Sequence, residues 1–269
     1  MSETLRIPRR VRHALKFRTL SVASVEDLTP TYRRIVLTGD DLDGFVSLGF
    51  DDHVKVFPPR PGEAPVMPTV GPDGPVFPEP RPAARDYTPR AYDPATRRLT
   101  LDFVTGHGGP ATEWAMAATP GAQLGVGGPR GSFIVPTAFA DHVLIGDETA
   151  LPAIARRLEE LPASVRATVI IAVKGASERL PLASAATLSV SWVDRADAAR
   201  SDPAPLSDAV EPALADVDRR DAYVWIAAEA QVARALRAQV VGLGFDPKAM
   251  KAAGYWREGG TAEKEVIED

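Results

Sequence analysis

The chain has 269 residues, of which 45% are hydrophobic and 25% charged, so it can build one large domain or two small ones around a real core. Its net charge of −5 disfavours nucleic acid as the main partner, because phosphate binding needs a basic face. The absence of cysteine excludes disulfides, thiolate zinc sites and cysteine-ligated iron–sulfur clusters. Redox chemistry would therefore need an organic cofactor or a metal with other ligands. The sequence shows neither a long apolar run nor a signal-like segment, and we expect a cytoplasmic protein without a membrane span.

The N-terminal half consists of short strand-like runs separated by turns. Residues 90–101 indicate a hairpin, and the Pro- and Gly-rich residues 58–82 indicate a long surface loop. Many short strands with frequent turns predict an antiparallel β-barrel over residues 1–138. The expected strands cover residues 17–25, 32–38, 53–57 and 99–104.

The C-terminal half alternates strands with helices. This pattern over residues 139–269 predicts an α/β domain with a doubly wound parallel sheet, which binds ligands at the carboxyl ends of its strands. The expected strands cover residues 142–146, 168–173, 188–193 and 223–227, and the expected helices 149–161, 206–217 and 232–243.

The first candidate motif is the run Arg85-Asp86-Tyr87-Thr88 on a predicted strand. Arg85 can pair with a phosphate, the ring of Tyr87 can stack on a planar cofactor, and Thr88 offers a hydroxyl donor. This combination suits a flavin. The alternative is a barrel strand with a buried tyrosine and surface arginines.

The second candidate follows the strand that ends near Val104. A glycine-rich turn leads to Pro110 and Thr112, which open a helix, and the free N–H groups at such a start suit a cofactor pyrophosphate. The alternative is an ordinary helix with Thr112 as its cap and Trp114 in the core, and with His107 structural or solvated.

Two further candidates lie in the C-terminal half. Residues 143–152 form a strand, a turn and a helix start where a dinucleotide loop would lie, but Asp147 and Glu148 would repel a pyrophosphate placed directly on them. A nucleotide would have to approach through backbone groups and Thr149. The alternative is a helix start whose acids suit the helix dipole. Ala228, at the end of a late strand, permits close approach of a ligand.

Two adjacent aromatic residues, Tyr255 and Trp256, lie near the C-terminus and could cover a planar cofactor. The alternative is packing at a sheet edge with Trp256 half-buried. Lys174 and Arg195 follow predicted strands, where a 2′-phosphate would lie, so we expect NADPH rather than NADH as donor.

Together these motifs resemble the siderophore-interacting proteins, or ferric-siderophore reductases, within the ferredoxin-reductase-like flavoproteins. The resemblance runs over residues 17–259. Its most specific parts are residues 85–88, 109–111 with Trp114, 128–131, 147–152 and 254–257.

The resemblance implies an N-terminal FAD-binding barrel and a C-terminal NAD(P)H-binding domain. Tyr87 would stack on the isoalloxazine ring and Thr88 would lie near its N5. These two residues are the predicted catalytic residues. The family usually has a histidine directly after the strand, whereas here Thr105-Gly106 precede His107, which leaves the role of His107 open. The residues expected to contact the two cofactors are Arg85, Asp86, Tyr87, Thr88, Asp102, Phe103, Val104, Thr105, His107, Gly109, Ala111, Thr112, Tyr255 and Trp256, together with Asp147, Glu148, Thr149, Ala150, Arg195, Ala228 and Glu229.

The resemblance also implies separated cations that hold an anionic ferric chelate. The matching positions are Lys55, Arg130 and Arg257, with Lys251 as an alternative to the third. Electrons would pass from NAD(P)H through FAD to the Fe(III) of a siderophore, and Fe(II) would leave because hard oxygen ligands hold it weakly. The alternatives are a flavin reductase that serves another protein or small acceptor, and a non-catalytic module that binds a flavin or a siderophore. We expect a monomer.

Overall fold

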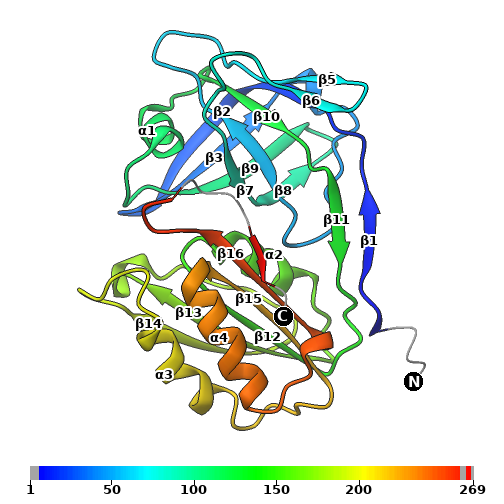
Figure 1. The fold of residues 1–269 in the computed structure, drawn as a ribbon, viewed down its shortest axis with the longest axis vertical. Coiled ribbons are helices and arrows are strands. Elements are labelled where there is room, and N and C mark those ends of the chain that lie inside the picture. Colours follow the sequence, from blue (N-terminus) through cyan, green and yellow to red (C-terminus); the bar gives the residue numbers. More distant parts are fainter. Residues whose placement is uncertain (1–5, 261–264, 268–269) are drawn as a thin grey trace. The chain divides into compact units, whose positions relative to one another are not determined.

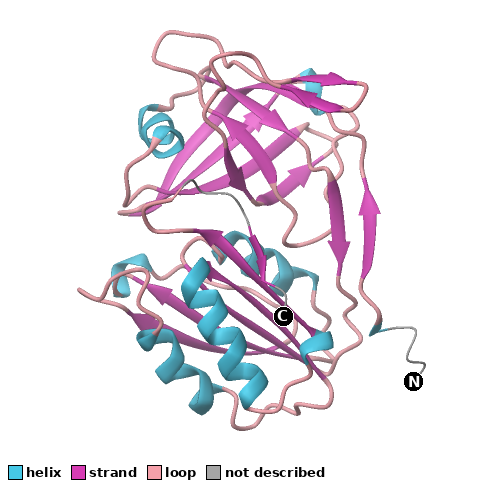
Figure 2. Cartoon of the chain, in the orientation of Figure 1, coloured by secondary structure: helices cyan, strands magenta, loops and turns pink. Residues whose placement is uncertain are grey.

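The computed structural model describes residues 6–260 and 265–267, and the chain divides into two compact units. The N-terminal unit comprises residues 8–135, and the C-terminal unit comprises residues 6–7 together with the described residues from 136 onward. Figure 1 labels the elements, and Figure 2 separates helices from strands. Each unit is described by itself. None of the helices among the described residues is long and apolar enough to cross a membrane.

The N-terminal unit is built on a seven-stranded antiparallel sheet with the order β7-β4-β10-β2-β3-β9-β8. A ribbon of β1 with β11 and a short hairpin of β5 with β6 complete its strands. The elements are β1 (Arg9–Arg12), β2 (Phe17–Thr29), β3 (Tyr32–Thr38), the 3-10 turn Asp40–Leu42, β4 (Val54–Phe57), β5 (Thr69–Gly71), β6 (Gly74–Val76), β7 (Arg85–Tyr87), β8 (Pro89–Asp93), β9 (Arg98–Val104), α1 (Pro110–Ala117), β10 (Gln123–Gly127) and β11 (Gly131–Ile134).

The seven-stranded sheet curls because of how its edges are connected. Strands β7 and β8 are its two edge strands, yet Thr88 alone separates them in sequence. A single residue cannot span an open sheet, since successive Cα atoms are only about 3.8 Å apart, so the edges must approach each other. Alternate residues of each strand then point into one core, which includes Leu20, Ile35 and Leu101.

The predicted antiparallel barrel is thereby confirmed as a curled antiparallel sheet, and the hairpin predicted over residues 90–101 is present as β8 and β9. The prediction that residues 58–82 form only a loop was wrong. This segment contains the β5–β6 hairpin, in which Thr69 pairs with Val76. Val70 and Val76 of this hairpin are exposed, so the sequence has no buried alternation there to reveal the strands.

The C-terminal unit carries a six-stranded sheet with the order β14-β13-β12-β15-β16-β17. The first five strands are parallel, and β17 pairs antiparallel with β16. The elements are β12 (Asp141–Asp147), α2 (Leu151–Glu160), β13 (Arg166–Val173), the 3-10 turn Ala176–Glu178, β14 (Thr187–Asp194), α3 (Ala204–Ala213), β15 (Ala222–Glu229), α4 (Ala230–Gly242), the 3-10 turn Pro247–Ala249, β16 (Met250–Trp256) and β17 (Glu265–Ile267).

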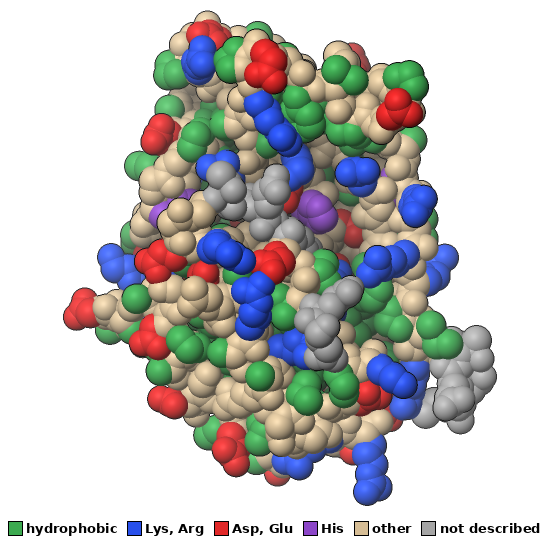
Figure 3. Space-filling view, in the orientation of Figure 1, with side chains coloured by type: hydrophobic (Ala, Val, Ile, Leu, Met, Phe, Trp, Pro, Cys, Tyr) green, Lys and Arg blue, Asp and Glu red, His purple; other side chains and the backbone are tan. Residues whose placement is uncertain are grey.

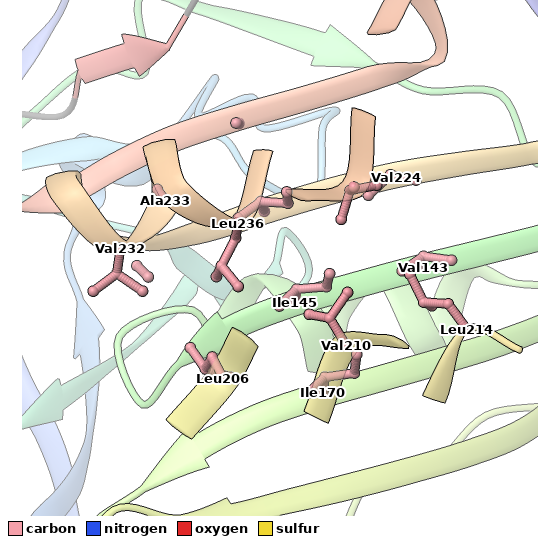
Figure 4. Close-up of a cluster of buried hydrophobic side chains, with 14 of the residues drawn as sticks. Val143, Ile145, Ile170, Leu206, Val210, Leu214, Val224, Val232, Ala233 and Leu236 are labelled. Carbon is pink, nitrogen blue, oxygen red and sulfur yellow. The ribbon is translucent and has the colours of Figure 1, made fainter. Parts of the chain in front are cut away.

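Helices cover both faces of this sheet, as the doubly wound prediction requires. Val143 and Ile145 of β12 pack with α3 and α4 in one cluster, which Figure 4 shows in close-up. Leu144 points to the opposite face, and α2 packs on β12 and β13 outside that cluster. Every residue of β12 and of β15 is buried, which is typical of central parallel strands.

The helix boundaries differ from the prediction where proline intervenes. Helix α2 begins at Leu151 rather than at Thr149, because residues 147–150 form a turn and Pro152 occupies the first helical turn. Helix α3 begins two residues earlier than predicted, after Pro203, and ends at Ala213 next to Pro212.

The order of the strands in the sheet places β12 and β15 side by side at the point where the winding direction reverses. Ligands of open α/β sheets bind at the carboxyl ends of the strands at such a point.

Candidate functional site

The first candidate motif lies at the junction of the two edge strands of the N-terminal sheet. Strand β7 ends at Tyr87, and the buried Thr88 forms the junction to β8. The ring of Tyr87 packs on Phe103, with centroids 4.3 Å apart, and Phe103 packs on Trp114 at 5.8 Å. Burial raises the pKa of Tyr87, so its phenol stays neutral at physiological pH. The ring of Tyr87, supported from behind by the fully buried Phe103, is a platform on which a planar cofactor can lie.

Lys55, predicted to bind the ferric chelate, and Asp86, predicted to contact FAD, form an ion pair in this unit. Lys55 of β4 pairs directly with Asp86 of β7, and the Lys55 Nζ atom lies 3.1 and 3.3 Å from the two carboxylate oxygens. The Asp86 side chain is 8% exposed, whereas that of Lys55 is 36% exposed. Asp86 therefore holds the ammonium group of Lys55 at the surface before any ligand is bound.

The predicted cation Arg130 belongs to the same end of the sheet. Gly127 of β10 pairs with Lys55, and Arg130 follows three residues later with an exposed side chain. The buried Arg18 holds the intervening turn by donating to the Gly128 carbonyl at 2.7 Å. The N–H group of His13 donates to the Arg130 carbonyl at 3.0 Å. The sequence analysis missed Arg18 and His13, because each acts through the backbone of another segment.

The second candidate motif forms the predicted helix start. Helix α1 begins at Pro110 with Gly109 as its N-cap, and no side chain caps its first turn. Gly109 has a φ of 131°, a conformation that side chains other than glycine rarely adopt. The alternative with Thr112 as the cap is therefore wrong. Thr112 is buried, and its Oγ1 atom lies 3.2 Å from His107 Nδ1.

The uncapped first turn of α1 leaves N–H groups for an anion, and the buried Ala111 keeps the approach free of bulky side chains. His107 is exposed, and its Nδ1 also lies 3.0 Å from the Gly108 carbonyl. The N–H group of Thr105 donates to the Thr31 carbonyl at 2.8 Å and holds the start of this turn.

The side chains of the predicted FAD contacts that precede this turn make their contacts within the curled sheet. Asp102 accepts two hydrogen bonds from Arg34, its cross-strand partner, at 2.7 and 2.8 Å. These bonds raise the pKa of Arg34. The side chains of Phe103 and Val104 are buried in the sheet. The sequence analysis missed Arg34, because a cross-strand partner is visible only once the register is known.

In the C-terminal unit, Asp147 ends β12 at the reversal point of the sheet. Its Oδ1 atom accepts the N–H group of Thr149 at 2.8 Å, and its Oδ2 atom accepts the Trp256 Nε1–H group at 2.8 Å. Gly146 precedes it, and a Cβ atom there would lie 2.5 Å from both the Ala150 Cβ atom and the Ala227 carbonyl oxygen. The single glycine of the motif therefore permits close packing of strand, turn and neighbouring strand.

Glu148, the second acid of the turn, faces two arginines. Arg195 Nη2 lies 2.7 and 2.9 Å from its two oxygens, and Arg200 Nε lies 3.2 Å from one of them. Burial raises the pKa of Glu148, and neighbouring Asp147 raises it further, whereas the two arginines act in the opposite direction. The Arg200 guanidinium also lies 4.2 Å from the centroid of the Trp256 ring. The sequence analysis predicted Arg195 but missed Arg200, whose loop position carries no periodic signal.

Glu229, the last residue of β15, caps helix α4. Its Oε2 atom accepts the N–H groups of Gln231 and Val232, and its Oε1 atom accepts the N–H group of Glu258 at 3.4 Å. It is 1% exposed. The carboxylate that was predicted to contact a nucleotide therefore occupies the N-terminus of its own helix. Ala228 beside it is fully buried.

The C-terminal strand β16 carries the remaining predicted residues. Tyr255 packs edge-on against Trp225 at 6.0 Å. Arg257 follows the carboxyl end of β16, is exposed, and pairs with Glu265 at 2.9 Å. The alternative cation, Lys251, is the second residue of β16 and pairs with Trp225 near the opposite end of the strand. Both residues stay predicted positions for the third cation.

A curled antiparallel sheet together with a parallel sheet wound in this order is a fold that this chain shares with solved ferredoxin reductases. A solved ferredoxin reductase of carbazole 1,9a-dioxygenase shares the fold at 16% identity and a TM-score of 0.62, over 88% of this chain and 68% of its own.

The particular family follows from closer similarities. Residues 21–133 match the model of the siderophore-interacting FAD-binding domain, and residues 139–259 match that of siderophore-interacting proteins. The NADPH-dependent ferric-chelate reductase of Escherichia coli strain K12 is 39% identical over 95% of this chain and 99% of its own length. A siderophore utilization protein from T. fusca, known from its crystal structure, is 36% identical, with a TM-score of 0.86 over 96% of this chain and 98% of that one. The chain belongs to the siderophore-interacting protein family.

Proposed function

We propose that this protein is a flavin-dependent reductase that passes electrons from NADPH through FAD to the Fe(III) of a siderophore. The observation that carries the proposal is the pairing, within one unit, of the Tyr87 ring platform with the uncapped start of α1. Full-length similarity to a ferric-chelate reductase supports the same chemistry. FAD, when bound, can accept two electrons as a hydride from NADPH and release them one at a time. It can therefore connect a two-electron donor to Fe(III), which accepts a single electron.

The N-terminal unit fits FAD at two places. Tyr87, backed by Phe103, offers a neutral aromatic surface to a planar ring, and the buried Thr88 hydroxyl lies directly beside it in sequence. The first turn of α1 offers N–H groups to a pyrophosphate, with Gly109 and Ala111 keeping the approach open. Asp102 and Phe103 would act by shaping the sheet, since their side chains are engaged within it.

The C-terminal unit is the proposed NADPH-binding domain. The turn over residues 147–150 and the end of β15 at Ala228 lie at the reversal point, where such sheets bind dinucleotides. Tyr255 and Trp256 remain the predicted aromatic cover of a planar ring. Arg195 remains the predicted contact of a 2′-phosphate, which would have to compete with Glu148 for its guanidinium.

Lys55, Arg130 and Arg257 are the proposed cations for an anionic ferric chelate. Arg130 and Arg257 have exposed side chains, and Lys55 is held at the surface by Asp86. An acidic protein needs local cations to attract an anionic substrate, because its overall field is repulsive. Iron enters this scheme only as substrate: no cluster of three or more His, Asp or Glu side chains among the described residues could hold a metal ion.

The decisive experiment is an anaerobic stopped-flow measurement on purified, FAD-loaded protein. NADPH should bleach the flavin absorbance, and mixing the reduced protein with a ferric triscatecholate should restore it. A protein that takes up no flavin would refute the proposal. A flavin that NADPH reduces but that no ferric chelate reoxidises would favour the flavin reductase that serves another acceptor.

Two further predictions accompany this function. We propose that the protein works as a monomer, to be checked by light scattering. We also propose the cytoplasm as its compartment, where NADPH is supplied, to be checked by cell fractionation.

A further inference from the structure

One arginine at the carboxyl edge of the parallel sheet has unused hydrogen-bonding capacity. Arg200 lies in the loop after β14, its guanidinium stacked on Trp256 and its Nε atom 3.2 Å from Glu148. Its Nε and Nη2 atoms are buried and make no hydrogen bond within the described part of the chain. Buried polar atoms of this kind are uncommon in folded proteins and call for an explanation.

The surroundings of Arg200 explain how the acidic turn with Asp147 and Glu148 can lie beside a pyrophosphate. An acidic turn should repel a pyrophosphate, yet both of its carboxylates are already occupied. Asp147 accepts hydrogen bonds from Thr149 and Trp256, and Glu148 faces Arg195 and Arg200. Two negative charges thus lie beside two positive ones, so the turn has no net charge to repel an anion.

The two arginines differ in what they can still bind. Arg195 is 8% exposed and uses its Nη2 atom on both oxygens of Glu148, and its Nε atom makes no hydrogen bond within the described part of the chain. The Arg200 side chain is 26% exposed, its Nε atom approaches one oxygen of that carboxylate at 3.2 Å, and its Nη2 atom has no hydrogen-bond partner within the described part of the chain. The adjacent Ser201 donates to Glu258, so the loop is held at the carboxyl end of β16. Arg200 is therefore the more exposed of the two arginines and the one that Glu148 engages less closely.

We infer that Arg200 binds the pyrophosphate of the nicotinamide dinucleotide. The inference rests on the proposed function. In doubly wound sheets the pyrophosphate lies at the first strand–helix turn, which here is the turn that contains Glu148. A planar guanidinium matches phosphate oxygens, and stacking on Trp256 orients it before binding. Because NADPH and NADH share the pyrophosphate, Arg200 binds both and does not choose between them.

The test compares three variants of the full-length, FAD-loaded protein. Arg200→Met keeps an apolar stem on Trp256 and removes the donors, whereas Arg200→Lys keeps the charge without the planar group. Arg220→Met is the control: Arg220 is exposed and lies just before β15, at the amino edge of the same sheet. Calorimetry measures the Kd of NADP⁺ and of NAD⁺, and competition measures that of inorganic pyrophosphate.

Arg200→Met should raise the Kd of NADP⁺ and of NAD⁺ by the same factor, about 10- to 100-fold for a lost hydrogen bond to a charged group. It should also abolish competition by inorganic pyrophosphate. Arg200→Lys should lie between this variant and the wild type, and it carries the comparison if the Met variant does not fold. Arg220→Met should bind as the wild type does.

Three results would overturn the inference. A Kd raised for NADP⁺ alone would assign Arg200 to the 2′-phosphate, and unchanged Kd values in both Arg200 variants would leave it no role in binding. Each of these leaves the proposed function standing, because the wild type still binds. A wild-type chain that binds neither dinucleotide would overturn the proposed function together with the inference.

Discussion

His142 is expected to make the stability of the C-terminal unit depend on pH. It is the second residue of β12, it is fully buried, and its Nε2 atom has no hydrogen-bond partner within the described part of the chain. Burial, and secondly the charge of Arg157, lowers the pKa of His142 from 6.5 to about 3. Arg157 Nη2 lies 3.5 Å from His142 Nδ1, so a protonated ring would lie beside a buried guanidinium.

The sign follows from the two pKa values. The folded chain keeps His142 neutral down to about pH 3, whereas in the unfolded chain the ring protonates below 6.5. The stabilisation is complete above pH 6.5 and is lost as the pH falls toward 3. Between about pH 7.5 and about pH 5, this group alone should lower the free energy of unfolding by about 2 kcal/mol.

The assay is urea unfolding of wild type and His142→Gln at constant ionic strength, followed by far-UV circular dichroism at both pH values. The variant should lose the His142 contribution, so the difference in free energy of unfolding between the two proteins should change by about 2 kcal/mol across this range. Parallel curves for wild type and His142→Gln would refute the reasoning.

Three of our predictions concern other parts of the molecule. Replacing Lys55 and Arg130 together with Met should raise the KM for an anionic ferric chelate by about 100-fold, for two lost charge-assisted contacts, and have far less effect with a neutral dye as acceptor. Equal effects on both acceptors, measured in steady-state assays, would argue against a substrate role. Gly146→Ala places a Cβ atom 2.5 Å from the Ala227 carbonyl oxygen and should destabilise the chain by about 1–3 kcal/mol in urea unfolding. Gly175→Ala meets no atom within 4 Å and is the control, and equal stability of the two variants would contradict the packing argument. Flavin bound to Tyr87→Leu should dissociate more readily than from the wild type in ultrafiltration, because the stacking surface is lost.

The sequence predicted the fold class and most strands because hydrophobic alternation marks them directly. It located the start of α1, where Pro110 follows a glycine-rich turn. It failed at the β5–β6 hairpin, whose apolar side chains Val70 and Val76 are exposed and leave no pattern of burial. Local propensity is informative only where one face of an element is buried.

The candidate site could be predicted as a set of positions but not as a set of contacts. Asp86, Asp102 and Glu229 stay predicted cofactor contacts, and in the structure their carboxylates hold Lys55, Arg34 and the start of α4. Each partner is either far away in the sequence or part of the backbone. Pairing of this kind depends on the register of neighbouring strands and on where a helix begins, and the spacing of residues in the sequence encodes neither.

These pairings have a consequence for affinity. Figure 3 shows Lys and Arg side chains interspersed with Asp and Glu over the visible face, and two of the three proposed chelate-binding cations, Lys55 and Arg257, already have a carboxylate partner. A paired cation is oriented in advance, which lowers the entropic cost of binding an anion, but the anion must compete with that carboxylate. Arg130 is exposed, and no carboxylate within the described part of the chain pairs with it, so an anion binds there without displacing a partner. Salt should therefore weaken chelate binding mainly through Arg130, and an anionic chelate has to compete with Asp86 for Lys55.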